Sequence, residues 1–131
     1  MGHGTRMQEF LRHFGRHRGW TRGFVAAIPE QYFGWSPRLD DFTCGGLVRH
    51  MMAAEVFWRR LIVAGAAGEP FDPFQLPGDL QARVEAFRAP NVAAARREKY
   101  GKTFADCLAS WEPIQAETEA ALGAIAEENL D

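Results

Sequence analysis

Cysteine is scarce in this 131-residue sequence, which contains only Cys44 and Cys107. Two cysteines do not provide the disulfide framework that stabilises small secreted domains, so both thiols are expected to be free. The sequence also lacks an apolar run of the roughly 20 residues that a membrane-spanning helix needs. Its N-terminus lacks the apolar core of a signal peptide. These absences predict a cytoplasmic protein that has no membrane partner.

An excess of positive charge is also absent. The net charge is −2 and the isoelectric point is about 6.1. These values argue against binding to nucleic acid, because nucleic-acid-binding domains are usually basic. The charges are unevenly spread, since arginine is concentrated over positions 6–22 and acidic residues over positions 112–131. Two interpretations remain open: solvated helix faces that attract each other, or a first helix that binds phosphate groups.

Strand patterns are missing as well, and apolar residues recur instead at the three- and four-residue steps of a helical face. This spacing predicts long helices over residues 5–28, 44–63 and 103–125, with a short helix over 79–87 and a partly helical segment over 88–102. Thr43 and Thr103 are the expected N-cap residues of the second and third long helices. We therefore expect residues 1–131 to form one all-α domain.

The second long helix carries an unusual residue on its predicted apolar face. Leu47, Met51 and Ala54 form an apolar stripe, and His50 is expected to point in the same direction. A lone histidine in such a place is usually a core residue with a satisfied hydrogen bond. Neutral imidazole is also the commonest metal ligand in proteins. The spacing alone leaves both interpretations of His50 open.

Several other residues have both a structural and a functional interpretation. Glu55 is either a boundary residue or a proton carrier, and Trp58 is most simply a core residue. His13 and His17 are four positions apart on one helical face, where they either contact water or chelate a metal. Cys44 begins the second helix, but the sequence offers it no acid–base partner. We therefore do not expect Cys44 to be a catalytic nucleophile.

The stretches FVAAIPEQYFGWSP and GGLVRHMMAAEVFWRRL resemble the DinB-like superfamily of bacterial four-helix bundles. That superfamily includes damage-inducible DinB proteins and thiol-dependent S-transferases. The shared pattern is a first helix that ends near IPE, a loop with tryptophan and proline, and a helix with Leu-x-x-His followed by Glu and Trp. In this sequence the helical pattern falls on Leu47, His50, Glu55 and Trp58.

The resemblance is close over about residues 10–63 and looser beyond them. It implies a bundle of the up-and-down type, with three long helices present and the fourth helix missing. The chain would then be either incomplete at its C-terminal end relative to the family or a natural variant without the family's metal site. The family's homodimers also imply that this protein forms a homodimer. Three aromatic-rich helices support the same expectation, because they leave apolar surface uncovered and C₂ dimers are the commonest oligomers.

The resemblance further implies a divalent metal, zinc or nickel, bound by three histidines inside the bundle. The first of these ligands matches His50. The other two belong to a His-x-x-x-His pair, for which the sequence has no counterpart after His50. The metal is therefore expected in a complete form that supplies this pair, and its binding by the present chain is left open. No catalytic residue is identified.

The residues and the family pattern together are consistent with two functions. The first is a metal-dependent transferase that acts on a low-molecular-weight thiol. A metal-bound thiol readily loses its proton, and the resulting thiolate is the nucleophile. The second function is that of a non-catalytic stress-response or interaction protein built on the same bundle. The sequence does not decide whether the protein is an enzyme.

Overall fold

The computed structural model describes residues 5–37, 43–69 and 90–130, and these ranges contain helices but no β-strand. The all-α class predicted from the sequence is thereby confirmed for the described residues. None of the helices they form is long and apolar enough to cross a membrane. The predicted short helix over 79–87 lies outside the described residues. The α-helices are α1 (Thr5–Ala27), α2 (Cys44–Ala66), α4 (Pro90–Tyr100) and α5 (Phe104–Gly123), with 3₁₀ turns η1 (Glu30–Tyr32) and η2 (Glu127–Leu130).

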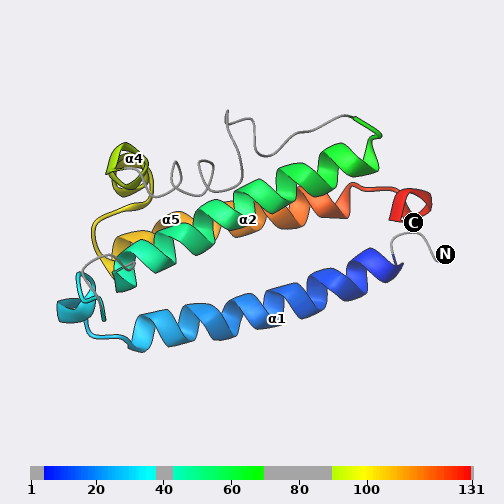
Figure 1. Ribbon diagram of the computed structural model, residues 1–131. Helices are drawn as coiled ribbons and strands as arrows, with labels where there is room; N and C mark the ends of the chain where they lie inside the picture. The colour runs from blue at the N-terminus through cyan, green and yellow to red at the C-terminus, as the bar shows by residue number, and fades with distance from the viewer. Residues whose placement is uncertain (1–4, 38–42, 70–89, 131) are drawn as a thin grey trace.

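The three long helices α1, α2 and α5 lie along one another, and α4 is a short helix beside α2 and α5 (Figure 1). Both α1 and α2 pack chiefly on α5 rather than on each other. Leu11 near the start of α1 lies beside Gly123 at the end of α5, so these two helices are antiparallel. Arg49 and Arg59 of α2 bond to successively later residues along the chain, Gly101 and Ile114, so α2 and α5 are parallel. The described helices therefore depart from the strict alternation of an up-and-down bundle.

The ends of α2 and α5 follow from their capping residues. Thr43 Oγ1 accepts a hydrogen bond from the Gly46 amide at 2.9 Å, and Thr103 Oγ1 accepts one from the Asp106 amide at 3.0 Å. Both predicted N-caps are thus confirmed. The carboxylate of Glu30 also accepts bonds from two amides in the first turn of α5, at 3.0 Å each. This contact joins η1, the turn that follows α1, to the start of α5.

A tight turn between α4 and α5 depends on Gly101. Its φ angle is +123°, in a region that side chains rarely adopt, and a Cβ atom there would collide with Asp106. The Gly101 carbonyl accepts a hydrogen bond from Nε of Arg49 at 2.8 Å. The guanidinium of Arg49 in turn lies 4.8 Å from the centre of the Phe33 ring. The turn is therefore held against α2 by one buried arginine.

The hydrophobic core lies where α1, α2 and α5 meet, with Tyr100 of α4 beside them. Its largest fully buried side chains are Trp111, Phe104 and Met52. The whole buried apolar cluster consists of Val25, Val48, Met52, Tyr100, Phe104, Cys107 and Trp111.

The apolar face that we predicted for α2 is wrong by about one residue. Val48, Met52 and Glu55 are buried, whereas Leu47 is 49% exposed and Met51 is only partly buried. Trp58, predicted to be a core residue, is 55% exposed. The physical reason is that α2 carries two neighbouring apolar lines. The line that contains Val48 and Met52 faces α5.

Candidate functional site

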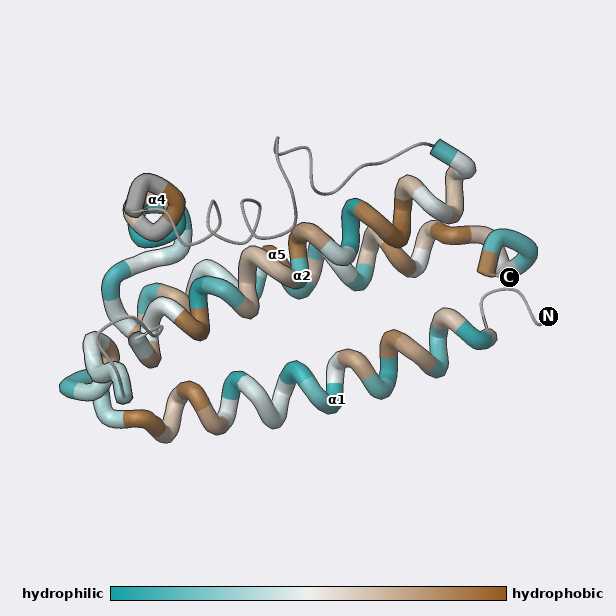
Figure 2. The backbone as a smooth tube through the Cα atoms, in the orientation of Figure 1, coloured by the Kyte–Doolittle hydropathy of each residue, from teal (hydrophilic) through white to brown (hydrophobic). Residues whose placement is uncertain are grey.

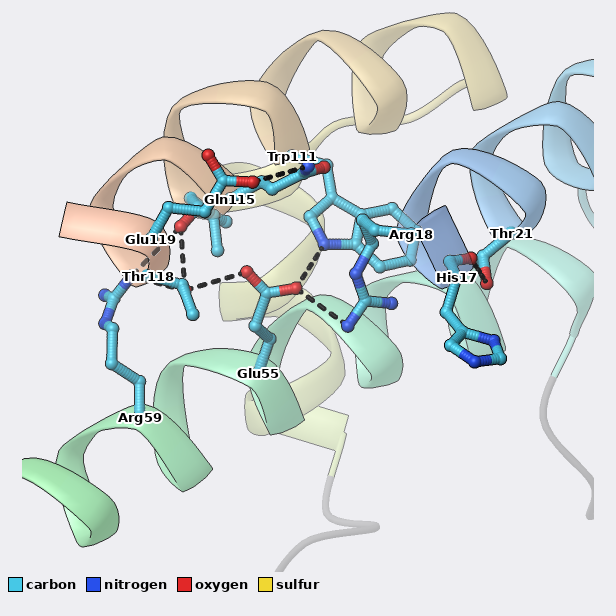
Figure 3. A network of polar contacts seen from close by, with 10 residues as sticks. His17, Arg18, Thr21, Glu55, Arg59, Trp111, Gln115, Thr118 and Glu119 are labelled. Atoms are coloured by element: carbon cyan, nitrogen blue, oxygen red, sulfur yellow. Dashed lines mark hydrogen bonds and ion pairs between the residues drawn. The ribbon is translucent and has the colours of Figure 1, made fainter. Parts of the chain in front are cut away.

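A cluster of polar side chains is buried where the three long helices meet, and we call it the Glu55 cluster (Figure 3). Arg18 Nη2 of α1 lies 2.9 Å from Oε1 of Glu55 on α2. From α5, Trp111 Nε1 donates to the same oxygen at 3.1 Å, and the hydroxyl of Thr118 donates to Oε2 at 2.9 Å. Glu55 and Thr118 are buried. One carboxylate of α2 is thus bonded to both neighbouring helices.

The Thr118 hydroxyl links this carboxylate to a second arginine. Its single proton has two acceptors at 2.9 Å, Glu55 Oε2 and the carbonyl of Ile114. The charged carboxylate is the stronger acceptor. The hydroxyl oxygen accepts from Arg59 Nη1 at 3.1 Å. The resulting chain of bonds orients Arg59, which also lies near Glu117.

Arg18 is held by aromatic rings as well as by its charge. Its guanidinium lies 5.1 Å from the centre of the Phe14 ring and 4.8 Å from that of Trp111. Its Nε atom is buried and has no hydrogen-bond partner. Arg18, Trp111 and Thr118 together satisfy both oxygens of Glu55. The interpretation of Glu55 as a boundary residue is therefore wrong, and the arrangement is that of an internal anchor between helices.

Reasoning from the sequence missed Arg18 and Thr118 as members of this cluster. A signal was present for Arg18, which lies four residues after Phe14 and seven before Val25, on the inward line of α1. An arginine on such a line requires a buried acid on another helix. Glu55, three residues after Met52, satisfies that requirement.

His50 lies on the side of α2 that faces α4, and it is partly buried. Its Nδ1 atom is 3.2 Å from Nη1 of Arg96. Because arginine can only donate, Nδ1 accepts, and the proton of the neutral ring is on Nε2. Burial and then the nearby Arg96 charge lower the pKa of His50 below its ordinary value. The structure therefore favours a neutral imidazole.

The surroundings of His50 do not fit a divalent cation in this arrangement. The Nδ1 lone pair is engaged by Arg96, whose positive charge would oppose that of a metal. No group of three His, Cys, Asp or Glu side chains that could hold a metal occurs within residues 5–37, 43–69 and 90–130. His13 and His17 are exposed on α1, whereas His50 is on α2. The ligand role of His50 stays a prediction.

The buried thiol of Cys107 is unsuited to nucleophilic chemistry. It is fully buried in the core and points toward the Gly101 carbonyl, at 4.0 Å. Burial raises the pKa of the Cys107 thiol, more strongly than the Arg49 charge lowers it. The thiol therefore stays protonated near neutral pH, and a protonated thiol is a poor nucleophile.

Large apolar side chains are exposed on both α1 and α2. Figure 2 shows hydrophobic segments on both helices, and on α1 a hydrophilic stretch in the middle separates them. Phe24 is 75% exposed and Trp58 is 55% exposed. We call this set the α1–α2 face. Its six members are Phe10, Trp20, Phe24, Leu47, Trp58 and Ile62.

Helix geometry places both halves of this face on the same side of the molecule. Phe10 and Phe24 lie one position before the inward residues Leu11 and Val25 of α1, and Leu47 lies one position before Val48 of α2. One residue rotates the direction of a side chain by about 100°. Since α1 and α2 are antiparallel to each other, these rotations carry both sets away from α5. The apolar members of the α1–α2 face therefore point away from α5 on both helices, and the exposed His13 and His17 lie between Phe10 and Trp20 on α1.

Lowering the pH should weaken the fold through His50. Its folded pKa is below the unfolded value of about 6.5, so the folded state binds fewer protons. The stabilising contribution of the neutral His50 side chain is complete above about pH 6.5, and it is lost as the pH falls through the folded pKa. We expect the urea midpoint to fall between pH 7.5 and pH 5, and to fall less in His50→Gln, whose amide oxygen can still accept from Arg96. Equal falls in both proteins would show that His50 is not responsible.

Comparison of the chain with protein-family models, with curated proteins and with solved structures finds no match. The resemblance to DinB-like proteins therefore stays a prediction from the residues quoted above.

Proposed function

We propose that this chain is a DinB-like bundle protein that acts by binding another protein chain through its α1–α2 face. The sequence left two functions open, and this proposal is the second of them, a non-catalytic interaction protein. The observation that carries the proposal is the exposure of Trp20, Phe24 and Trp58, the three most exposed aromatic side chains of that face. Large apolar patches that are exposed on a protein surface are typical of protein–protein contacts.

The polar groups of the interior support the same proposal. Glu55 is bonded to three donors, His50 accepts from Arg96, and Cys107 is a buried thiol. Each of these reactive residue types is engaged in holding helices together. The surface, by contrast, presents large side chains whose burial on a partner would be favourable.

Photo-cross-linking in cells tests this proposal. A benzophenone amino acid placed at Phe24 or Trp58 should give discrete cross-linked products, because these positions would lie inside the contact. The matched control is the same probe at Ala116, which is exposed on α5 and should give none. Mass spectrometry identifies the cross-linked protein. Equal labelling from all three positions, or no product from any, would contradict binding through the α1–α2 face.

The second candidate is the metal-dependent thiol S-transferase implied by the resemblance. One observation favours it: His50 is held neutral, which is the form of imidazole that binds zinc or nickel. Such a site would need Arg96 to leave Nδ1 and would need further ligands. Calorimetric titration of zinc into the protein and into His50→Ala tests it, and stoichiometric binding that His50→Ala abolishes would support the enzyme.

A further inference from the structure

We infer that α1 binds an amphipathic helix of a partner protein, one that carries apolar side chains at both ends of the contact and acidic side chains between them. The contact surface is the α1 stripe, which we define as Phe10, His13, His17, Trp20 and Phe24. The inference rests on the function proposed above, and it names the chemistry of the partner that the α1 part of the α1–α2 face would hold.

The α1 stripe has the geometry of a surface to which another helix binds. Its side chains are all exposed, and they follow one another at alternating steps of three and four residues. This spacing keeps side chains on one side of a helix, and contacts between neighbouring helices use the same spacing. From Phe10 to Phe24 the stripe is about 21 Å long, since each residue adds about 1.5 Å. A partner helix of about four turns would cover it.

The aromatic side chains toward the two ends of the stripe are ordered by ring contacts within the chain. The Phe10 ring stacks on Phe14, with 6.2 Å between the ring centres. The Trp20 ring meets the His17 ring at 84°, with 5.1 Å between the centres. Side chains that are already ordered lose little conformational entropy when a partner covers them. Phe10 is 49% exposed and Trp20 is 57% exposed, so covering both with apolar side chains would be favourable.

The charge of α1 selects an acidic partner. Arg12 and Arg16 are exposed next to His13 and His17 in the chain. Arg12 has an exposed ion pair with Glu9 at 3.7 Å, and such pairs contribute little free energy. Arg16 makes no hydrogen bond or ion pair with any residue in the described ranges. Carboxylates on a partner helix would meet this positive charge, whereas a basic helix would be repelled.

The two histidines place the acidic side chains in the middle of the partner helix. An apolar helix that covered His13 and His17 would leave their ring N–H groups without acceptors, at a cost in free energy. A carboxylate supplies the acceptor. Figure 2 shows the matching order on α1, where a hydrophilic stretch separates the hydrophobic segments. The partner should therefore carry apolar residues about ten positions apart, as Phe10 and Trp20 are, with acidic residues between them.

Binding of synthetic peptides to the purified 131-residue chain tests the inference. Both peptides are amphipathic helices of about 20 residues, long enough to cover the stripe, with leucines near each end. One carries glutamates between the leucines and the other carries lysines. In fluorescence anisotropy we expect the glutamate peptide to bind at least about tenfold more tightly, and added salt to weaken its binding. Equal affinity for the two peptides, or no binding of either, would overturn the inference.

A charge reversal on α1 shows whether the glutamate peptide binds at the stripe. Arg16→Glu should weaken its binding about tenfold or more. Arg97→Glu, at an exposed position of α4, is the matched control and should leave the affinity unchanged. Circular dichroism shows whether both variants keep their helices. Equal losses in the two variants would mean that the peptide responds to net charge alone, and would overturn binding at the stripe.

A zero-length cross-link detects the partner's carboxylate while the charge of α1 is kept. Arg16→Lys keeps the positive charge and supplies an amine, which a carbodiimide joins to a carboxylate in contact with it. In cell extracts we expect an amide bond to an acidic residue that lies between apolar residues of a helix in the partner. Arg97→Lys is the matched control and should not be joined to that protein.

The outcomes separate this inference from the proposed function. If benzophenone at Phe24 captures a protein in cells but the amine of Arg16→Lys is not joined to it, the interaction function stands and the acidic helical partner is wrong. A product joined only to a second copy of the chain would also overturn the acidic partner. If neither probe gives a product, both the function and the partner are wrong.

Discussion

Replacing Trp111 with alanine should lower the free energy of unfolding by about 3–5 kcal/mol, the range for deleting a large buried aromatic side chain. Trp111 is fully buried and is the largest side chain of the core. The substitution would remove its packing and leave a cavity. It would also remove the Nε1 donor of Glu55 and one of the two rings beside the Arg18 guanidinium. A small domain has a total free energy of unfolding of about 5–15 kcal/mol, so this substitution would remove a large part of it.

Two further variants separate the contributions of the Trp111 side chain. Trp111→Phe keeps most of the ring and removes the hydrogen bond, so its expected cost is about 1–3 kcal/mol. Trp35→Ala is the matched control, because Trp35 is 55% exposed and its loss should change stability by less than about 0.5 kcal/mol. Urea denaturation at one fixed protein concentration measures all three. Equal losses for Trp111→Ala and Trp35→Ala would show that the core is not centred on Trp111.

The helices could be predicted from the sequence because their signals are local. Thr43 and Thr103 precede apolar repeats, and each caps its helix in the structure as expected. The segment 88–102, predicted to be partly helical, contains α4. Caps and apolar repeats act within one or two turns of chain, so they can be read without knowledge of the tertiary contacts.

The inward face of α2 could not be predicted in the same way. Leu47 and Trp58 form one line on this helix, while Val48, Met52 and Glu55 form another. Hydrophobicity alone favours the line with tryptophan over the line with glutamate. Burial of Glu55 becomes favourable only because distant residues of α1 and α5 neutralise and bond its carboxylate. The identity of the buried line is therefore a tertiary property.

The same error misplaced His50. Its predicted orientation relied on Leu47, but Leu47 is itself exposed, and His50 is turned toward α4. Arg96, which engages its ring, comes from a segment that was expected to be only partly helical. The sequence therefore showed that the imidazole was unusual without showing its partner.

Replacing Arg18 with methionine should destabilise the protein by about 3–5 kcal/mol, because it leaves the Glu55 carboxylate buried without its cation. The side chain of Glu55 is 3% exposed and that of Arg18 is 19% exposed, so water cannot readily replace the lost charge. Methionine keeps the apolar stem of arginine but has no guanidinium, so the variant loses the charge together with the contacts of that group with Phe14 and Trp111. A further comparison is needed to separate the ion pair with Glu55 from these ring contacts.

A double-mutant cycle distinguishes these causes. Glu55→Gln removes the charge that Arg18 neutralises but keeps acceptor and donor atoms for Trp111 and Thr118. In the presence of Glu55→Gln, the substitution Arg18→Met should cost less than it does alone, by about 1–3 kcal/mol. Urea denaturation of the four proteins gives this coupling energy. If the two losses add within about 0.5 kcal/mol, Arg18 stabilises the bundle through its packing, and the Glu55 cluster is not an electrostatic anchor.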